Sequence, residues 1–195
     1  MFTPSEVSYQ FISGLVKDLH SGDRLEVLCV YACNSNIERR VLWRRMIEIF
    51  VEWRGSSMVM GDFNTITLHS KAFGGAPNPG DMEEFDMAIR EVDLVELSVQ
   101  ENWFTWTSKV HGSGLIRRLD RILVNDEGLN AWPNMRVNVL PWGNSDHSLI
   151  HVYPSYQQRQ RVVSFRFFNH WVEEASFLDI VSSVWAKDTS LGQNN

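Results

Sequence analysis

Three short polar clusters draw attention because each contains a carboxylate close to a second group able to bind or move protons. They are Gly61-Asp62-Phe63-Asn64, Arg118-Leu119-Asp120-Arg121 and Ser145-Asp146-His147. Carboxylates and an imidazole serve acid–base chemistry, and carboxylates also hold divalent cations near phosphate. Each cluster is weak evidence alone, because most such aspartates cap turns or form solvated ion pairs, and most single histidines lie on the surface.

The segments that must position these clusters are apolar runs typical of strands. We predict strands at 25–31, 58–60, 104–107, 118–124 and 148–153, and a half-buried strand at 7–11, where apolar and polar residues alternate. Each polar cluster adjoins or lies within such a run. Polar groups at strand ends gather along one rim of a sheet, which is where layered α/β proteins place their sites.

Two helices are predicted between these strands. Residues 37–53 repeat apolar side chains at helical spacing after Ser35, which with Glu38 has the pattern of a capping box. We interpret the arginines on the other side of this helix as a solvated face. Residues 82–92 form the second helix, with Asp81 and Glu84 as its expected cap. Strands and helices in this order predict a mixed sheet covered by helices.

Composition limits the classes of function. The chain has 195 residues and a formal net charge of −6, and residues 56–110 contain three Lys or Arg against nine Asp or Glu. A protein that held nucleic acid by charge alone would usually be basic. No apolar run approaches the ~20 residues of a membrane-spanning helix. Two cysteines are too few for a disulfide scaffold, and we expect both to be reduced.

The chain divides into two parts after Pro154. Residues 1–154 contain all the predicted strands, and residues 155–195 are predicted to be a linker, an amphipathic helix and a disordered tail. The apolar face of that helix consists of Val172, Ala175, Leu178, Val181 and Trp185.

Four motifs in order resemble the endonuclease/exonuclease/phosphatase family. They are VYACNSN, GDFN, RRLDRILVN and SDHSLI. The sequence most resembles the endonuclease domain of plant non-LTR (LINE-type) retrotransposons, because FTWTS precedes RRLDRILVN and FRFFNHWVEEASFLDIV follows further on. The resemblance covers roughly residues 7–185. It implies an α+β fold, the four-layer α/β/β/α sandwich of that family, and a Mg²⁺-dependent or Mn²⁺-dependent phosphodiesterase that contacts the DNA phosphate backbone.

The resemblance also implies roles for four catalytic residues. Asp62 would orient or deprotonate the attacking water, and Asn64 would donate its amide to a phosphate oxygen. His147 would stabilise developing charge on phosphate, and Asp120 would bond the other ring nitrogen and fix the tautomer. A plain turn residue remains an alternative for Asn64.

Three further positions are implied around the phosphate. Asp146 would lie at or near the metal, and Tyr31 and Asn34 would contact the scissile phosphate. Tyr31 could instead be an aromatic residue that packs its ring at a strand end. Arg117 and Arg118 are additional phosphate candidates because they adjoin Asp120.

One part of the family pattern is not found. Family members carry a strand ending in Asn and a metal-binding Glu before the VYACN motif, and the only glutamates before Tyr31 are Glu6 and Glu26, outside any Glu-Thr-Lys context. We therefore expect an N-terminally truncated domain with exposed apolar faces, weakened metal binding and weak or no activity.

Three functions remain open from the sequence. The first is a DNA endonuclease homologue derived from a retrotransposon. The second is a phosphatase acting on inositol or lipid phosphates, and the third is a non-catalytic remnant that binds nucleic acid or protein. We expect an intracellular location, nuclear if the protein is a functional retroelement endonuclease, because no targeting signal is visible.

Overall fold

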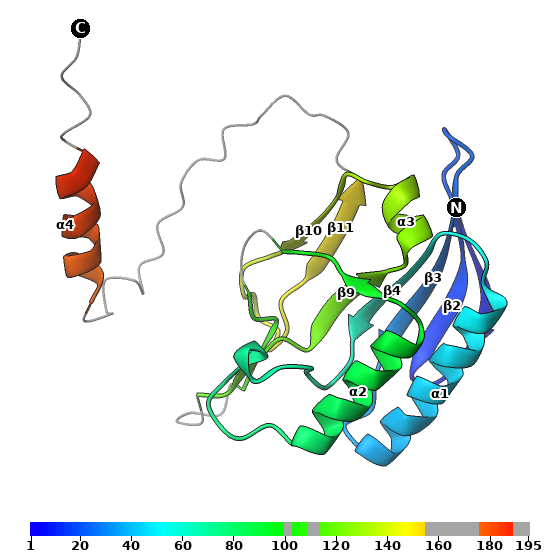
Figure 1. Cartoon of the computed structure of the whole chain (residues 1–195), viewed down its shortest axis with the longest axis horizontal. Coiled ribbons are helices and arrows are strands. Elements are labelled where there is room, and N and C mark those ends of the chain that lie inside the picture. Colours follow the sequence, from blue (N-terminus) through cyan, green and yellow to red (C-terminus); the bar gives the residue numbers. More distant parts are fainter. Residues whose placement is uncertain (100–102, 109–113, 155–175, 189–195) are drawn as a thin grey trace, which may run out of the picture. The chain divides into compact units, whose positions relative to one another are not determined.

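The structure is a computed structural model that describes residues 1–99, 103–108, 114–154 and 176–188. The chain forms two units, Met1–Tyr156 and Gln157–Asn195. All the described strands lie in the first unit (Figure 1).

A six-stranded sheet lies at the centre of the first unit, in the order β1-β2-β3-β4-β9-β6. These strands are β1 (Phe2–Val7), β2 (Phe11–Lys17), β3 (Arg24–Tyr31), β4 (Ser57–Asp62), β9 (Asp120–Val124) and β6 (Val95–Glu96). β3 and β4 run parallel and are connected through helix α1 (Asn36–Glu52), whereas the other pairs are antiparallel. The parallel pair brings the carboxyl ends of β3 and β4 to the same edge of the sheet.

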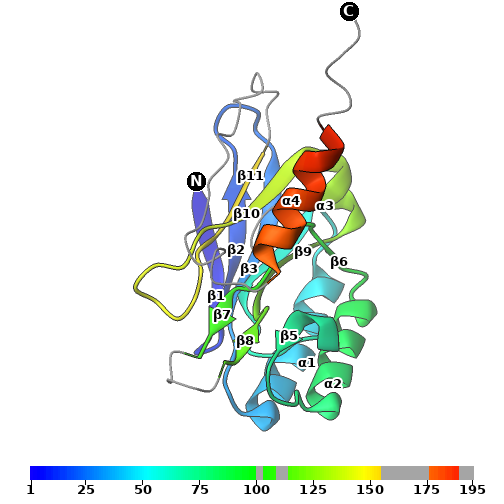
Figure 2. The ribbon, with the colours of Figure 1, turned by 90° about the vertical axis from the view of Figure 1, so that its left-hand side faces the viewer.

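Two smaller sheets accompany the central one. One is the antiparallel pair β10 (Met135–Val139) and β11 (Ile150–Pro154), and the other has the order β5-β8-β7 (Figure 2). Strands of the latter are β5 (Ala72–Phe73), β8 (Ile116–Arg117) and β7 (Trp106–Thr107). The remaining elements are α2 (Pro79–Glu91), α3 (Asp126–Ala131), the short helix η1 (His69–Lys71) and α4 (Phe177–Asp188).

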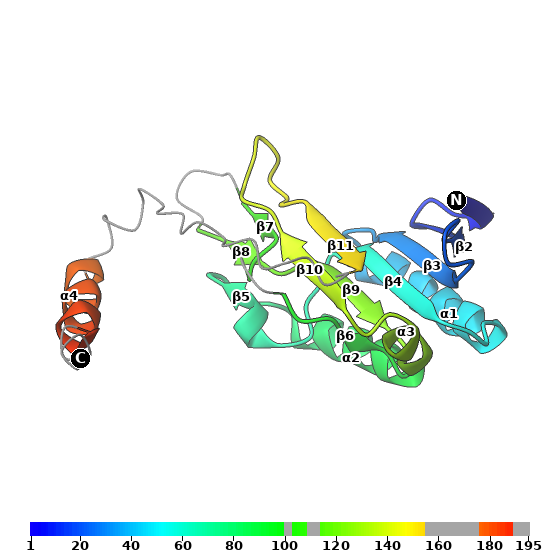
Figure 3. The same ribbon diagram turned by 90° about the horizontal axis from the view of Figure 1, so that it is seen from above.

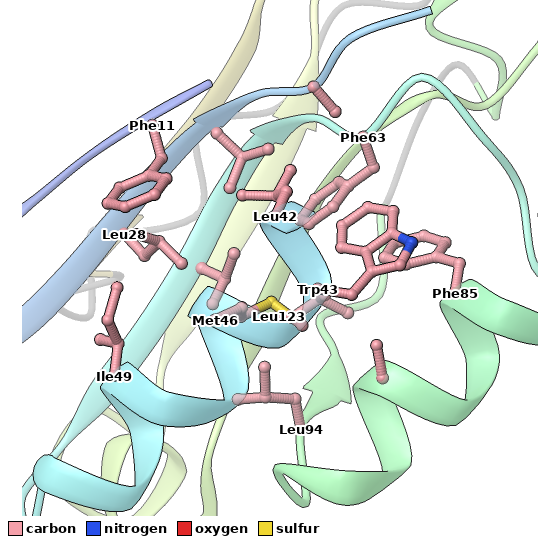
Figure 4. Packing of buried hydrophobic residues seen from close by; sticks show 14 residues of the cluster. Phe11, Leu28, Leu42, Trp43, Met46, Ile49, Phe63, Phe85, Leu94 and Leu123 are labelled. Atoms are coloured by element: carbon pink, nitrogen blue, oxygen red, sulfur yellow. The ribbon is translucent and has the colours of Figure 1, made fainter. Parts of the chain in front are cut away.

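Helices α1 and α2 cover one face of the central sheet, and β10 and β11 lie on the other (Figure 3). The core under the helices joins the apolar stripe of α1 to side chains of β3, β4 and β9 (Figure 4). Trp43 of α1 stacks on Phe85 of α2 with ring centroids 4.7 Å apart, and Phe63 lies 4.9 Å from Phe85. Phe63 directly follows Asp62, so this aromatic packing anchors the end of β4.

The described residues cover the opposite face only in part. Leu25, Val27, Met58 and Ile122 are buried there with Val137 of β10. Further along the same face, Ile12 and Cys29 are paired across β2 and β3, and both are exposed.

The predicted α+β layers are confirmed, but several local predictions are wrong. Residues 7–11 are not one strand, since β1 ends at Val7 and β2 begins at Phe11. Apolar residues on both sides of this hairpin turn produced a false alternation. Ser35 precedes α1 without a side-chain capping bond, and α2 is capped by Asn78, whose side chain accepts from the Gly80 amide, rather than by Asp81.

The arginines of α1 do not all belong to a solvated face. Arg39 is buried, with 3% of its surface exposed, and its guanidinium donates to the carbonyls of Cys33 and Asn34 and to Asp81. Two of these partners belong to the loop just before α1 and the third to α2, so helical spacing within α1 alone could not reveal them.

The second unit contains α4, and Leu178 and Ile180 of this helix are exposed. Val172 and Ala175, expected on the same apolar face, lie outside the described residues, as do the linker at 155–161 and the tail after Asp188. Among the helices that the structure describes, none has the length and apolar character needed to cross a membrane.

Gly61 provides a test of the geometry at the end of β4. Its φ is +132°, and a Cβ there would overlap the carbonyl oxygen of Val30 on the neighbouring strand. We therefore expect Gly61→Ala to lower the free energy of unfolding by at least about 3 kcal/mol, measured by urea denaturation. Gly143→Ala is the matched control, because a Cβ at Gly143 meets nothing within 4 Å. Equal stability of the two variants would contradict this geometry.

Candidate active site

Strand pairing brings three of the predicted residues to one rim of the sheet. Tyr31, the last residue of β3, pairs with Asp62, the last residue of β4, and Asp62 pairs with Asp120, the first residue of β9. The Phe63 amide donates to the Leu119 carbonyl at 3.0 Å, which holds the GDFN and RLDR segments together beyond the strand ends.

His147 reaches this rim from the segment before β11. It forms an isolated antiparallel bridge with Trp106 of β7, and the Thr107 amide donates to the Asp146 carbonyl. His147 Nδ1 lies 2.9 Å from Asp120 Oδ2, and His147 Nε2 lies 3.9 Å from Asp62 Oδ2. The imidazole therefore lies between the two carboxylates, with one ring nitrogen facing each.

Asp62, Asp120 and His147 form a group that could hold a metal ion, because their ligand atoms all lie within 4.8 Å of one another. A cavity of about 550 Å³ opens beside them. Its lining includes five more residues singled out from the sequence, namely Tyr31, Asn34, Asn64, Arg117 and Asp146. Asp146 is outside the three-residue group; the Trp106 indole donates to its Oδ2 at 3.2 Å. The role of Asp146 as a metal ligand stays a prediction.

Asp62 is the most perturbed carboxyl of the site. Only 6% of its surface is exposed, and burial raises its pKa to about 6, with a further increase from the nearby charge of Asp120. Three groups lower the pKa of Asp62. The backbone N–H of Asn64 donates to Asp62 Oδ1 at 2.8 Å, and the charges of His147 and Arg39 act in the same sense. A carboxyl with this pKa can accept a proton near neutral pH.

The side-chain amide of Asn64 already makes hydrogen bonds within the protein. Its Nδ2 donates to the Ala32 carbonyl at 3.1 Å and to Asn34 Oδ1 at 2.5 Å. Asn64 also has a positive φ of 51°, a turn conformation that asparagine tolerates. Donation to a phosphate oxygen, as predicted, would require one of these two bonds to open. Tyr31 does not pack its ring at the strand end, because 73% of its surface is exposed.

Two buried side chains that sequence reasoning missed hold the Cys33–Asn34 loop. The Arg39 guanidinium, on α1, donates to the carbonyls of Cys33 and Asn34. The side-chain oxygen of Gln10 accepts from the Cys33 amide at 2.9 Å. The Gln10 side chain also donates to the Glu38 carbonyl. Both residues therefore fix the backbone from which Asn34 faces the cavity. Neither belongs to a motif that would have indicated this role.

A buried charge network lies beneath the RLDR segment. The Glu96 carboxylate contacts Lys71 at 2.5 Å and Arg118 at 2.8 Å, with Arg121 3.8 Å away. Burial raises the pKa of Glu96, but the three cations outweigh this effect and the pKa is lowered overall. Arg118 is 2% exposed and also bonds the Trp103 carbonyl, so it is a structural residue and the prediction that it contacts phosphate is wrong. Arg117 remains at the cavity.

Comparisons of the sequence with protein-family models and with curated proteins gave no match. Solved structures do resemble the fold. The endonuclease domain of TRAS1, a telomere-specific non-LTR retrotransposon, is 14% identical over 80% of this chain and 70% of its own, with a TM-score of 0.56. The 3′ phosphatase NExo from Neisseria, bound to a product DNA hairpin, is 17% identical over 75% and 65%, with a TM-score of 0.54.

A third structure is an endonuclease/exonuclease/phosphatase family protein from Leptotrichia buccalis, 19% identical over 73% of this chain and 53% of its own, with a TM-score of 0.48. The chain thus spans between 53% and 70% of the length of these three structures. The first unit has the endonuclease/exonuclease/phosphatase fold, which it shares with the endonuclease domain of TRAS1 and with NExo.

The raised pKa of Asp62 predicts a specific dependence of stability on pH. Because the folded chain binds this proton more tightly than the unfolded chain, the resulting stabilisation is complete below pH 4 and is lost as pH rises through about 6. The free energy of unfolding should therefore fall by about 2–3 kcal/mol between pH 4 and pH 7.5 because of this group. We expect this fall to be absent in Asp62→Asn, which keeps an acceptor for the Asn64 backbone N–H.

Urea denaturation between pH 4 and pH 7.5 measures the difference between the two proteins. Asp23→Asn, a change in an exposed turn, is the matched control and should keep the original profile. Parallel profiles for Asp62→Asn and the unmodified chain would show that Asp62 is not held as the structure indicates.

Proposed function

We propose that this chain is a homologue of Mg²⁺-dependent DNA phosphodiesterases, with weak or no activity in the form given by this sequence. The observation that supports this proposal most directly is the convergence of Asp62, Asp120 and His147 beside one polar cavity. Hydrolysis of a phosphodiester needs a base for water, positive charge near the phosphate and stabilisation of the leaving oxygen.

The residues of the site can be assigned to these tasks. Asp62, with its pKa near neutral, would accept a proton from the attacking water. His147 would face the phosphate through Nε2, because its Nδ1 is bonded to Asp120. That bond orients the ring and favours the tautomer that carries its proton on Nδ1. Tyr31, Asn34 and Arg117 line the cavity where phosphate oxygens would lie.

The donor set fits a hard divalent cation. Asp62 and Asp146 present carboxylates to the same cavity, and oxygen ligands are those that Mg²⁺ and Mn²⁺ prefer. A cation would also relieve the cost of keeping Asp62 ionised beside Asp120. When bound, Mg²⁺ would offset phosphate charge and lower the pKa of a coordinated water.

DNA is the proposed substrate class. TRAS1, whose similar domain is a retrotransposon endonuclease, and NExo, whose structure holds a product DNA hairpin, support this choice. The FTWTS, RRLDRILVN and FRFFNHWVEEASFLDIV motifs favour a retrotransposon origin, and with it a nuclear location. The net negative charge requires DNA binding to depend on the site and its cation rather than on a basic surface.

The expected weakness of the activity follows from the metal ligands. Within the described part of the chain, no glutamate lines the cavity, whereas the resemblance implies a glutamate as a principal metal ligand. A cation held by fewer carboxylates binds less tightly. The same observation favours a non-catalytic nucleic-acid-binding remnant as the second candidate function.

We expect slow nicking of supercoiled plasmid that requires Mg²⁺ or Mn²⁺ and disappears in Asp62→Ala and His147→Ala. Exposed residues outside the cavity provide matched controls, and Asp126→Ala and His151→Ala should nick at the original rate. Nicking that survives both site substitutions would contradict the proposal. No nicking alongside retained DNA binding would favour the non-catalytic remnant, and turnover of inositol phosphates in place of DNA would favour the phosphatase.

Metal binding can be measured separately from cutting. Mg²⁺ should raise the thermal unfolding midpoint more at pH 7.5 than at pH 5, because protons compete with the cation for Asp62. Asp62→Asn should greatly reduce this gain, whereas Asp23→Asn should leave it unchanged. A gain of equal size at both pH values would show that the cation binds elsewhere.

A further inference from the structure

Thr105, in the FTWTS motif, lies directly behind the pair formed by Asp120 and His147. It is fully buried, and its hydroxyl oxygen accepts two backbone hydrogen bonds. The Leu119 amide donates to it at 3.0 Å and the Asp120 amide at 2.9 Å. A single side-chain oxygen therefore fixes the backbone that carries the Asp120 carboxylate.

The main chain of Thr105 bonds both segments of the site. Its amide donates to the Arg117 carbonyl at 2.9 Å, on the side of Asp120. Its carbonyl accepts from the Ser148 amide at 2.7 Å, directly after His147. The next residue, Trp106, bridges His147 itself. Thr105 thus touches the RLDR segment through its side chain and main chain, and the SDHS segment through its main chain.

We propose that Thr105 is a positioning residue that sets the distance and orientation between Asp120 and His147. It does not line the cavity and touches no reacting atom. Its effect acts through Asp120, whose carboxylate orients the imidazole. The purpose of this geometry rests on the proposed function, but the geometry itself can be measured without any activity.

The chemistry of the side chain explains why threonine suits this position. A hydroxyl oxygen has two acceptor lone pairs, which match the two adjacent amides. Valine has nearly the same shape but no acceptor, so Thr105→Val would leave two buried N–H groups without their bonds. The RLDR backbone would then move to find other partners, and the 2.9 Å contact between Asp120 and His147 would open. Serine keeps the acceptor and removes only the methyl group.

The test follows the ring N–H proton of His147 by NMR. A proton shared between imidazole and carboxylate in a half-buried site gives a downfield resonance that exchanges slowly with water, and His147→Ala and Asp120→Asn assign it by its disappearance. We expect Thr105→Ser to retain this resonance. We expect Thr105→Val to lose it, or to show exchange about tenfold faster.

Thr107→Val is the matched control. Thr107 lies two residues further along, in β7, and its hydroxyl donates to the Leu115 carbonyl instead of receiving bonds from the Asp120 segment. This variant should keep the resonance and its exchange rate. Circular dichroism establishes which variants fold, and if Thr105→Val does not fold, Thr105→Ser decides the question through the same resonance.

The outcomes separate this inference from the proposed function. A resonance that persists unchanged in folded Thr105→Val, or is lost in Thr105→Ser, overturns the positioning role. If the resonance behaves as expected while the unmodified chain neither nicks DNA nor gains stability from Mg²⁺, the result supports the positioning role and counts against the proposed function.

Discussion

Two aspartates directly opposite each other on neighbouring strands are the constraint around which this site is organised. Asp62 and Asp120 are register partners in an antiparallel pair, so their side chains project from the same face. Like charges in such a pair destabilise a sheet by up to about 1 kcal/mol, and here one of them is also buried. The site therefore favours a hydrogen-bond donor or a cation between the two carboxylates, and the His147 imidazole lies there, with Nδ1 2.9 Å from Asp120 Oδ2.

Separate supports hold the two aspartates in this unfavourable arrangement. The end of β4 is fixed by the stacked aromatic rings under α1 and α2, because Phe63 belongs to that core. The start of β9 is fixed by Thr105 and by the charge network centred on Glu96. The energy that aligns the carboxylates comes from packing and buried hydrogen bonds outside the cavity, as expected for a preorganised site.

The sequence predicted the residues of the site better than the contacts that hold them. Asp62, Asp120 and His147 could be found because polar residues beside strands meet at one rim, and antiparallel pairing of β4 with β9 places Asp62 opposite Asp120. Arg39 and Arg118 could not be assigned in this way, since the burial of an arginine depends on partners that are distant in the chain. Strand β10 does carry an alternating pattern in Met135, Val137 and Val139, but five residues are too few to separate it from a loop.

The arrangement of Asp62, Asp120 and His147 does not depend on the strength of metal binding. The supports described for Asp62, Asp120 and His147 come from α1, α2 and the segments between Ser57 and Ser148. Apart from the main-chain bond at Asp146, these supports come from residues that are not proposed metal ligands, so a weak metal site does not by itself loosen the aspartates and the imidazole. Burial, and to a smaller extent the nearby charge of Asp120, still raises the pKa of Asp62. Proton uptake by Asp62 is then an alternative to cation binding, because either event removes the repulsion across the strand pair and leaves the surrounding contacts in place.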